Sequence, residues 1–470
     1  MHLVDEKQAV PLTSEAELLE YFASAGKPRS AWRVGSEHEL IGVWPETGAA
    51  PTYDGERGIG ALLQWFADRG GTPVMETLST ASEYGAVFAE AAHGAATVNN
   101  MIALVRGDSQ LTIEPGGQFE LASRPVDDDR KLVMDLEEYT DALGRASREL
   151  GIAWLSIGLR PFGGRDDIPW MPKQRYEVMR EYMATVGTRG QDMMVRTATV
   201  QANLDFEDEA DASAKMECLY SVTSILTALW AASPIVEDKV SAYQSYRAWI
   251  WRDTDNARAG LVPFAFGRQD VFKGYTEWAL DIPMYFLYRG GYRRVPGDLT
   301  FRKFMRDGFG GERATHEDWA LHLSTLFPEG RLKKFIEVRG CDCGSLEMIA
   351  ALAPMMRGLL YDVDARTAAT ALTTGLDFAQ RQQLCEDVPT QGFKARAGAH
   401  TLGELAKELV AIAKSGLAKL APGSLPLLAP VEEIAQSGRT QADKIIDIWN
   451  THAGDRKALI KALAHPGLAG

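Results

Sequence analysis

The segment WRVGSEHELI places two glutamates, Glu37 and Glu39, one residue apart inside an apolar stretch. On a β-strand, residues i and i+2 point to the same face, so these two carboxylates would lie side by side. Like charges on a half-buried face repel each other and disfavour ionisation. The pair therefore calls for a compensating cation, and oxygen ligands of this kind favour Mg²⁺ or Mn²⁺ over zinc.

Three further segments alternate polar and apolar side chains with a period of two: SQLTIEPGGQFELAS, RTATVQANLDF and KKFIEVRGCD. The polar pairs that share a face are Gln118 with Glu120, Gln201 with Asn203, and Glu337 with Arg339, and Glu114 lies in the turn of the first segment. Such alternation predicts strands with one face on a core and one face open. A single glutamate on a strand is usually solvated, but converging polar faces would form a cup lined by oxygen ligands.

Two segments rich in arginine supply positive charge. The first, MPKQRYEVMREYM, carries Lys173, Arg175 and Arg180, and the second, SYRAWIWRDTDNARAG, carries Arg247, Arg252 and Arg258 beside Trp249 and Trp251. Guanidinium groups bind carboxylates or phosphates in bidentate geometry, and neighbouring aromatic rings could shape a pocket for an amino acid. Composition alone supports equally well the alternative that these arginines are exposed and pack on the tryptophans.

The elements that must position these residues are an antiparallel sheet backed by helices, an α+β fold. Helical periodicity covers 14–22, 60–69, 135–150, 212–232, 348–361 and most of the chain after 367. The Ala-rich stretch 79–99 is interpreted as an insertion or mobile loop. We expect a helical lead-in over 1–30, a catalytic domain over 31–365 and a helical C-terminal region over 366–470 packed on it.

The bulk composition narrows the class of protein. A net charge of −14 over 470 residues argues against nucleic acid or an anionic membrane as the partner. No apolar run reaches the roughly 20 residues that span a bilayer. The N-terminal segment does not show the basic region followed by an apolar region that is typical of a secretory signal peptide. Four cysteines do not make a disulfide framework, so we expect a cytoplasmic protein. Cys341 and Cys343, in the motif CDC, are weak evidence for a soft-metal site, and no Walker-type phosphate loop is found.

Ordered segments from Arg33 to the C-terminus resemble the plant-type glutamate–cysteine ligases of plants and many proteobacteria. These segments are VGSEHEL, EPGGQFELA, MPKQRYEVMREYM, GTRGQDMMVRTATVQANLDF, YRAWIWRDTDNARAGLVPFAF, ALDIPMYFLYR, LTFRKFM and LFPEGRLKKFIEVRGCD. No transit segment precedes them, which favours a proteobacterial, cytoplasmic version. The stretch 79–98 is longer than the resemblance leads us to expect, and Cys341-Asp342-Cys343-Gly344 stands where relatives often read Ala-Asp-Gly-Gly.

The resemblance implies a cup- or funnel-shaped antiparallel sheet related to glutamine synthetase and the guanidino kinases, with helices outside. It implies ATP-dependent joining of the glutamate side-chain carboxylate to the cysteine amine through γ-glutamyl phosphate, the first step of glutathione biosynthesis, with Mg²⁺ or alternatively Mn²⁺. Its implied metal ligands are Glu37, Glu39, Glu114, Glu120, Gln201 and Glu337. The resemblance implies catalytic roles for Glu37, Glu337 and Arg339. It implies nucleotide binding by Arg339, Gln201 and Asn203, and substrate binding by Arg175, Arg180, Arg247 and Trp251.

Three alternatives stay open at this point. A ligase on the same scaffold could join glutamate to an amine other than cysteine, and a phosphotransferase like the guanidino kinases would stop at a phosphorylated product. A non-catalytic binding protein is disfavoured because it has no reason to keep so repulsive a set of carboxylates. We expect small-molecule partners only, and a monomer or homodimer.

Overall fold

The computed structural model describes residues 10–79, 81, 84 and 96–464. Its centre is a nine-stranded sheet in the order β14-β15-β7-β1-β5-β4-β3-β2, with β6 paired to β1 off this path. The strands of this sheet are β1 (Val34–Val43), β2 (Thr72–Ser79), β3 (Thr97–Arg106), β4 (Ser109–Ile113), β5 (Phe119–Ala122), β6 (Ala153–Leu155), β7 (Thr199–Leu204), β14 (Gly330–Leu332) and β15 (Ile336–Asp342). Every pairing within it is antiparallel.

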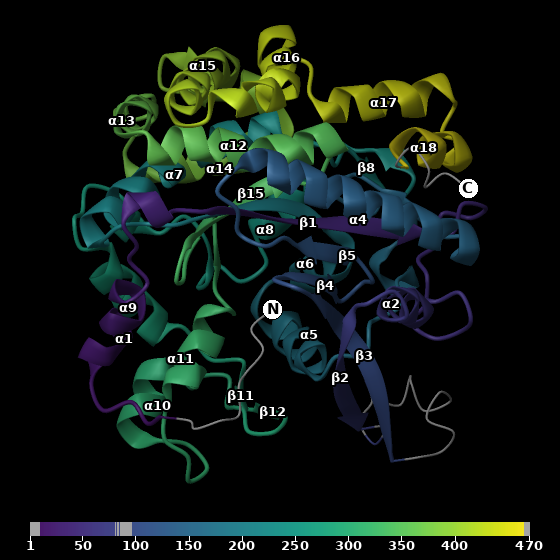
Figure 1. Ribbon diagram of the computed structural model, residues 1–470, viewed down its shortest axis with the longest axis horizontal. Coiled ribbons are helices and arrows are strands. Elements are labelled where there is room, and N and C mark those ends of the chain that lie inside the picture. The colour runs from purple at the N-terminus through teal and green to yellow at the C-terminus, as the bar shows by residue number, and fades with distance from the viewer. Residues whose placement is uncertain (1–9, 80, 82–83, 85–95, 465–470) are drawn as a thin grey trace.

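Helices surround the sheet (Figure 1). They are α1 (Glu15–Ala23), α2 (Ile59–Ala67), α4 (Asp129–Leu150), α5 (Gln174–Val186), α6 (Gly190–Arg196), α7 (Glu209–Leu229), α8 (Tyr246–Trp251), α9 (Val271–Asp281), α10 (Phe301–Asp307), α11 (His316–Leu323), α12 (Leu346–Tyr361), α13 (Val363–Ala371), α14 (Phe378–Gln391), α15 (Leu402–Leu420), α16 (Ala429–Ser437), α17 (Gln441–Thr451) and α18 (Arg456–Leu463). Short two-stranded sheets join β8 (Ile235–Val236) to β9 (Lys239–Val240), β10 (Ala259–Gly260) to β13 (Phe327–Pro328), β11 (Phe286–Tyr288) to β12 (Tyr292–Arg294), and β16 (Arg396–Ala397) to β17 (His400–Thr401).

The register of the sheet decides which side chains share a face. Glu39 on β1 lies opposite Glu120 on β5, and Glu37 lies opposite Gln201 on β7. On the next strand Glu337 lies opposite Asn203. Because directly paired residues project to the same side of an antiparallel sheet, all of these polar groups share one face. The convergence predicted from period-two alternation is therefore confirmed.

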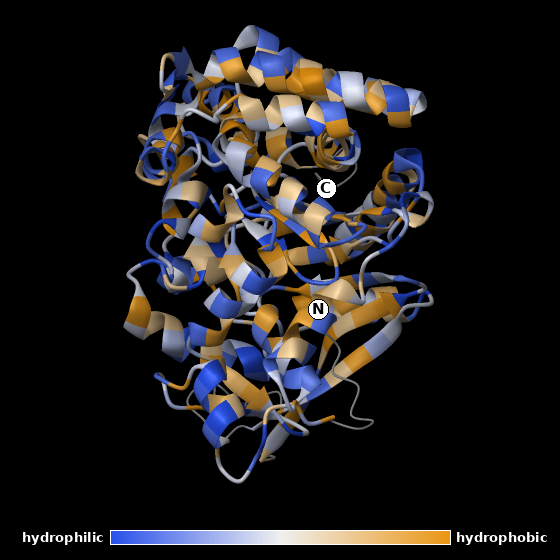
Figure 2. Cartoon of the chain, turned by 90° about the vertical axis from the view of Figure 1, so that its left-hand side faces the viewer, coloured by the Kyte–Doolittle hydropathy of each residue, from blue (hydrophilic) through white to orange (hydrophobic). Residues whose placement is uncertain are grey.

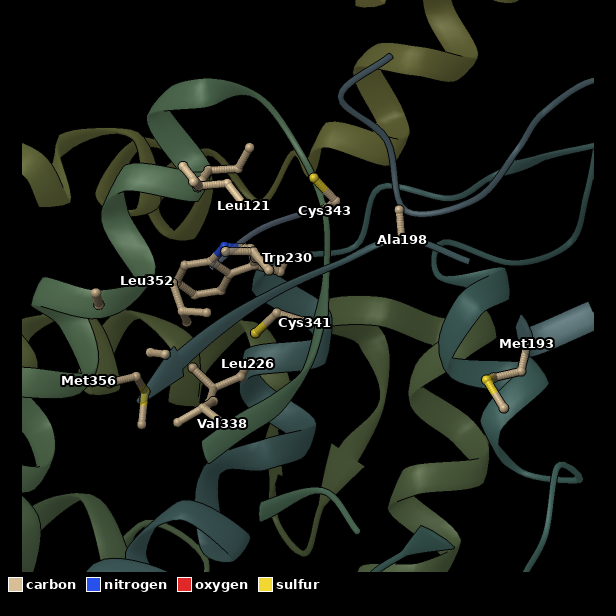
Figure 3. Packing of buried hydrophobic residues seen from close by; sticks show 14 of the residues in the cluster. Leu121, Met193, Ala198, Leu226, Trp230, Val338, Cys341, Cys343, Leu352 and Met356 are labelled. Atoms are coloured by element: carbon tan, nitrogen blue, oxygen red, sulfur yellow. The ribbon is translucent and has the colours of Figure 1, made fainter. Parts of the chain in front are cut away.

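The opposite face of the sheet packs on α4, α7 and α12 (Figure 1). Figure 3 shows this core, where Trp230, Leu352 and Met356 surround Val338 and Cys341 of β15. His38, between the two glutamates of β1, also points to this side, and its ring lies 5.5 Å from that of Tyr139 on α4. His38 is buried and therefore packs in the core rather than on the polar face.

The C-terminal helices form a further layer over α12 (Figure 1). Figure 2 shows hydrophobic and hydrophilic residues interleaved along these helices, as expected where one side of each helix packs inward. The division predicted after residue 365 stays a prediction, and α13 (Val363–Ala371) spans that position. Among the described helices, none is long and apolar enough to cross a membrane.

The predicted helices and strands are present, with α4 starting at Asp129 rather than at 135. The prediction of a loop over 79–99 is wrong at both ends, because Ser79 closes β2 and Thr97 opens β3. These two strands show no simple alternation, since β2 is an exposed edge strand and β3 a mostly buried one. The rest of that prediction falls mostly on 80, 82–83 and 85–95, outside the described residues.

The close contact between α12 and α15 yields a stability prediction. A Cβ added at Gly416 would stand 2.1 Å from the carbonyl oxygen of Gly358, so the two helices would have to separate. We expect Gly416→Ala to lower the free energy of unfolding by about 2 kcal/mol. Gly375→Ala, where nothing lies within 4 Å of the added Cβ, serves as the control and should change it by less than about 0.5 kcal/mol. Equal denaturant midpoints for the two variants would contradict this contact.

Candidate active site

The polar face of the sheet opens on a cavity of about 530 Å³. Helices α5, α6, α8 and α11 and the segment after β14 complete its walls. Of the residues predicted from the sequence, those on the wall are Glu37, Glu39, Glu114, Glu120, Arg175, Gln201, Asn203, Arg247, Trp251 and Arg339. The structure thus collects in one cavity residues from six separate segments of the chain.

One wall of the cavity is acidic. A protein donor holds each of three carboxylates: Asn203 Nδ2 at 2.7 Å from Glu37, the Thr199 amide at 3.1 Å from Glu39, and Thr112 Oγ1 at 2.6 Å from Glu120. Burial raises the pKa of all three groups. Repulsion between carboxylates raises these pKa values further. Glu337 and Glu120 raise the pKa of Glu37, and Glu114 and Glu120 raise that of Glu39. Glu114 also raises the pKa of Glu120.

The acidic wall suits a divalent cation that shares its ligands with a substrate. Within the described ranges, no group of three or more His, Cys, Asp or Glu side chains is close enough to hold a metal ion by itself. Mg²⁺ is usually bound by one or two carboxylates, waters and substrate phosphates rather than by a cage of protein ligands. Opposed Glu39 and Glu120, with Glu114 and Glu37 nearby, supply that donor set, and their mutual repulsion is the charge a cation would offset.

Another part of the cavity wall, on β14 and β15 of the same sheet, is basic and is organised by Glu337. This carboxylate is fully buried and contacts Arg331 Nε at 2.6 Å, Lys333 Nζ at 3.0 Å and Arg339 Nη1 at 2.7 Å. Burial opposes its ionisation, but the three cations hold its pKa well below the usual range. Arg331, Lys333 and Arg339 line the cavity, whereas Glu337 lies behind them.

This arrangement gives no support to the prediction that Glu337 is a metal ligand. Its carboxylate is already compensated by three protein cations, and a divalent cation beside it would be repelled by them. Gln201, a second predicted ligand, accepts a hydrogen bond from Arg339 Nη1 at 3.1 Å through its Oε1. Both residues therefore hold Arg339 in place, and metal ligation by either stays a prediction.

A third part of the site offers hydrogen-bond donors. Arg247 Nε, Trp251 Nε1 and Arg252 Nε are buried and have no hydrogen-bond partner among the residues that the structure describes. All three side chains line a small chamber that adjoins the main cavity through Arg247, Trp251 and Arg339. Arg252 is further paired with Glu329 at 2.5 Å. Buried N–H groups without acceptors are costly, so this chamber suits a ligand with acceptor oxygens, such as a carboxylate.

The remaining arginines differ in role. Arg175 lines the cavity, and its Nε has no partner among the described residues. Arg180 is not among the described lining residues, and its guanidinium stands 5.0 Å from the centre of the Trp170 ring, so its predicted substrate contact has no support here. Arg258 is buried against Asp255, Tyr182 and the Pro283 carbonyl, a structural role.

Three cations on the cavity wall were not predicted as site residues, although the sequence singles out one of them, Lys173, as a source of positive charge. Lys173 is 2 % exposed, and its Nζ donates to the Ile113 carbonyl at 2.6 Å beside Tyr176. Burial lowers its pKa, and the nearby Glu114 opposes that shift. Arg331 and Lys333 were not predicted either. Their position a few residues before Glu337 in the sequence could have indicated that they pair with it. All four cysteines are buried and free.

Acidic and basic groups that line a single cavity are the arrangement of a phosphoryl-transfer enzyme, where cations and arginines bind a polyphosphate. Residues 33–462 match the model of glutamate-cysteine ligase family 2, so the chain belongs to that family. It is 37% identical over 94% of its length to the chloroplastic glutamate–cysteine ligases of Brassica juncea and Arabidopsis thaliana, covering 82% and 81% of them. Ligase B of Oryza sativa is 36% identical, also over 94% of this chain and 85% of its own length. The predicted resemblance to plant-type members is confirmed.

A solved structure of the glutamate–cysteine ligase from Francisella tularensis, in complex with AMP, has a similar fold. It superimposes with a TM-score of 0.56 over 92% of this chain and 87% of that chain, at 14% sequence identity. This likeness supports the α+β fold with an antiparallel sheet that the sequence predicts.

The repulsion on the acidic wall yields a prediction for Glu39→Gln. Because the pKa of Glu39 is raised in the folded state, its ionisation destabilises the ligand-free protein as the pH rises above the ordinary glutamate value. The variant should therefore unfold on the order of 2 °C above the wild type at pH 8 without metal, and the gap should close towards pH 4.5.

The same melts with added Mg²⁺ test the metal site itself. Magnesium should raise the melting temperature of the wild type more than that of Glu39→Gln, since the variant offers one ligand fewer. Glu138→Gln, which removes an exposed carboxylate paired with Arg106, is the control and should behave as wild type. Identical magnesium responses in wild type and Glu39→Gln would contradict the assignment of Glu39.

Proposed function

We propose that the protein joins the γ-carboxylate of L-glutamate to the α-amine of L-cysteine at the expense of ATP, forming γ-glutamylcysteine, ADP and phosphate. Membership of the glutamate–cysteine ligase family over residues 33–462 supports this reaction. The structural observation that carries it is one cavity with three parts: a basic wall, an acidic wall and a chamber of unpartnered N–H donors. These parts match a polyphosphate, its counter-cation and an amino-acid carboxylate.

The use of ATP follows from the chemistry of the donor carboxylate. A carboxylate is a poor electrophile, so an oxygen of the glutamate side chain first attacks the γ-phosphorus of ATP, and ADP leaves. Arg331, Lys333 and Arg339 supply fixed positive charge along the path of the transferring phosphoryl group. Glu337 and Gln201 hold Arg339 in place, so this charge needs little reorganisation during the reaction.

Mg²⁺, or alternatively Mn²⁺, would be held by the acidic wall and would supply charge neutralisation of the phosphates. The residues proposed to hold it are Glu37, Glu39, Glu114 and Glu120. Asn203 contributes by fixing Glu37 through the 2.7 Å hydrogen bond. The hydrogen bonds from Thr199 and Thr112 orient Glu39 and Glu120 in the same way.

The amino-acid carboxylate is proposed to occupy the chamber lined by Arg247, Trp251 and Arg252. Arg247 is 3 % exposed, so a carboxylate bound there is screened from water and its charge pairing is strong. Arg175, at the start of α5, lines the main cavity rather than the chamber and is a further candidate for a substrate carboxylate. Because positioning supplies much of the rate in such reactions, these clamps are as important as the phosphate-binding groups.

In the second step the α-amine of cysteine attacks the γ-glutamyl phosphate at its carbonyl carbon. The C–N bond forms as the carbon–oxygen bond to phosphate breaks, and the amine loses a proton. No nucleophilic protein side chain is required. Cys218, Cys341 and Cys343 are buried in the core, and Cys385, also buried, lines the small chamber. The cytoplasm is the proposed location, although the plant relatives named above are chloroplastic, and a monomer or homodimer is the proposed assembly.

A panel of acceptors tests the function directly. With ATP, Mg²⁺ and glutamate present, ADP release should depend on an added amine, and cysteine should give the highest kcat/KM. Mass spectrometry of the product should find γ-glutamylcysteine. Faster ADP release with a simple amine than with cysteine would replace the acceptor but keep the ligase reaction. A phosphorylated product formed without any amine would contradict the proposal and favour a phosphotransferase.

A further inference from the structure

The CDC motif at the end of β15 holds a buried carboxylate that the proposed reaction does not use. Cys341 and Cys343 point into the packed core shown in Figure 3. Asp342, between them, projects to the other side, and its side chain is completely buried. A buried carboxylate is costly unless it is hydrogen-bonded and paired, so its partners indicate what it does.

Three donors satisfy Asp342. Its Oδ2 accepts from the Ala232 amide at 2.9 Å and from Ser233 Oγ at 2.6 Å. Its Oδ1 accepts from Ser245 Oγ at 2.8 Å and lies 3.9 Å from Arg247 Nη1. These partners come from the segment after α7 and from the start of α8, so one carboxylate joins β15 to both.

The two serines pass this constraint to α8. Ser245 is the N-cap of the helix, and its Oγ accepts from the Ala248 amide at 3.0 Å while donating to Asp342. Ser233 Oγ accepts from the Arg247 amide at 3.1 Å. Both serines are fully buried, so no water replaces these bonds. The start of α8 is thereby fixed at the backbone of Arg247 itself.

The side chain of Arg247 completes the link back to β15. Its Nη2 donates to the carbonyl oxygen of Arg339 at 3.0 Å, at the bulge that interrupts the pairing of β15 with β7. The Arg339 carbonyl thus holds Nη2 of Arg247 by a hydrogen bond, and the Asp342 carboxylate lies within ion-pair distance of Nη1. The Nε of Arg247 is itself buried and has no hydrogen-bond partner among the described residues.

We propose that Asp342 is a positioning residue that, through Ser233, Ser245 and Arg247, sets the orientation of the amino-acid carboxylate in the chamber. This inference rests on the proposed function, in which Arg247 binds that carboxylate. The carboxylate of Asp342 does not touch substrate; it fixes both the helix that carries Arg247 and Trp251 and the guanidinium that binds. Weakening it should loosen amino-acid binding and leave nucleotide binding unchanged.

Steady-state kinetics of ADP release by the full-length protein test this role, with Arg247→Ala as the reference. Asp342→Asn keeps the size of the side chain but places an amide NH₂ against one of its donors. We expect it to raise, at least tenfold, the KM of the same amino acid whose KM Arg247→Ala raises. The KM for ATP should stay within twofold, and kcat should fall less than KM rises.

Matched variants separate positioning from general loss of structure. Asp129→Asn alters another fully buried carboxylate, paired with Arg357, and should leave every KM within twofold. Ser245→Ala and Ser233→Ala keep the Asp342 carboxylate and remove one link each, so each should raise the same KM about three- to tenfold. These two serine variants decide the question if Asp342→Asn fails to fold in a thermal melt.

Unchanged amino-acid KM in Asp342→Asn, or in both serine variants where that one does not fold, would overturn the inference when Arg247→Ala still raises it. If Arg247→Ala also leaves every KM unchanged, the assignment of Arg247 in the proposed function fails too. A rise in the KM for ATP equal to that for the amino acid would reduce Asp342 to a structural residue.

Discussion

Repulsion among carboxylates on one face of the central sheet is the constraint on which the site depends. The antiparallel register places Glu39 opposite Glu120 and Glu37 opposite Gln201, and Glu114 lies close enough to raise the pKa of two of these carboxyl groups. The protein keeps these groups at a cost to its own stability in the absence of ligand. That cost is explained if a divalent cation, brought together with the nucleotide, offsets it.

The same sheet carries the opposite charge a few strands away. Glu337 gathers Arg331, Lys333 and Arg339 around one buried carboxylate, so three cations are held facing the cavity with little net charge buried behind them. Asp342, five residues further along β15, performs a related task for Arg247. In both cases a buried carboxylate fixes the position of cationic side chains, and those cations are the groups proposed to contact the substrate. This pattern supports the proposal that the two acids of β15 position cationic side chains and do not themselves contact substrate.

The sequence predicted the acidic wall because strict alternation on β1, β5, β7 and β15 fixes which side chains share a face. Composition marked Arg247 and Trp251 as possible pocket residues but equally allowed exposed arginines packed on tryptophans. Only the resemblance decided between the two, because α8 is a single short helix whose orientation comes from Asp342 and its serines. The burial of Glu337 behind its cations could not be read from alternation, which gives the face of a residue but not its partners. Strands β2 and β3 were not predicted from the sequence, because an exposed edge strand and a mostly buried strand show no period-two alternation of polar and apolar residues.

Calorimetric titration of the protein with Mn²⁺, in two buffers of different ionisation enthalpy, tests the central claim most directly. Carboxyl groups whose pKa is raised by burial and repulsion hold protons just above the ordinary glutamate pKa, and a cation must displace them. The account predicts proton release on Mn²⁺ binding in that pH range, reduced in Glu120→Gln. Mn²⁺ binding without proton release, or release unaltered in Glu120→Gln, would contradict the acidic wall as the metal site.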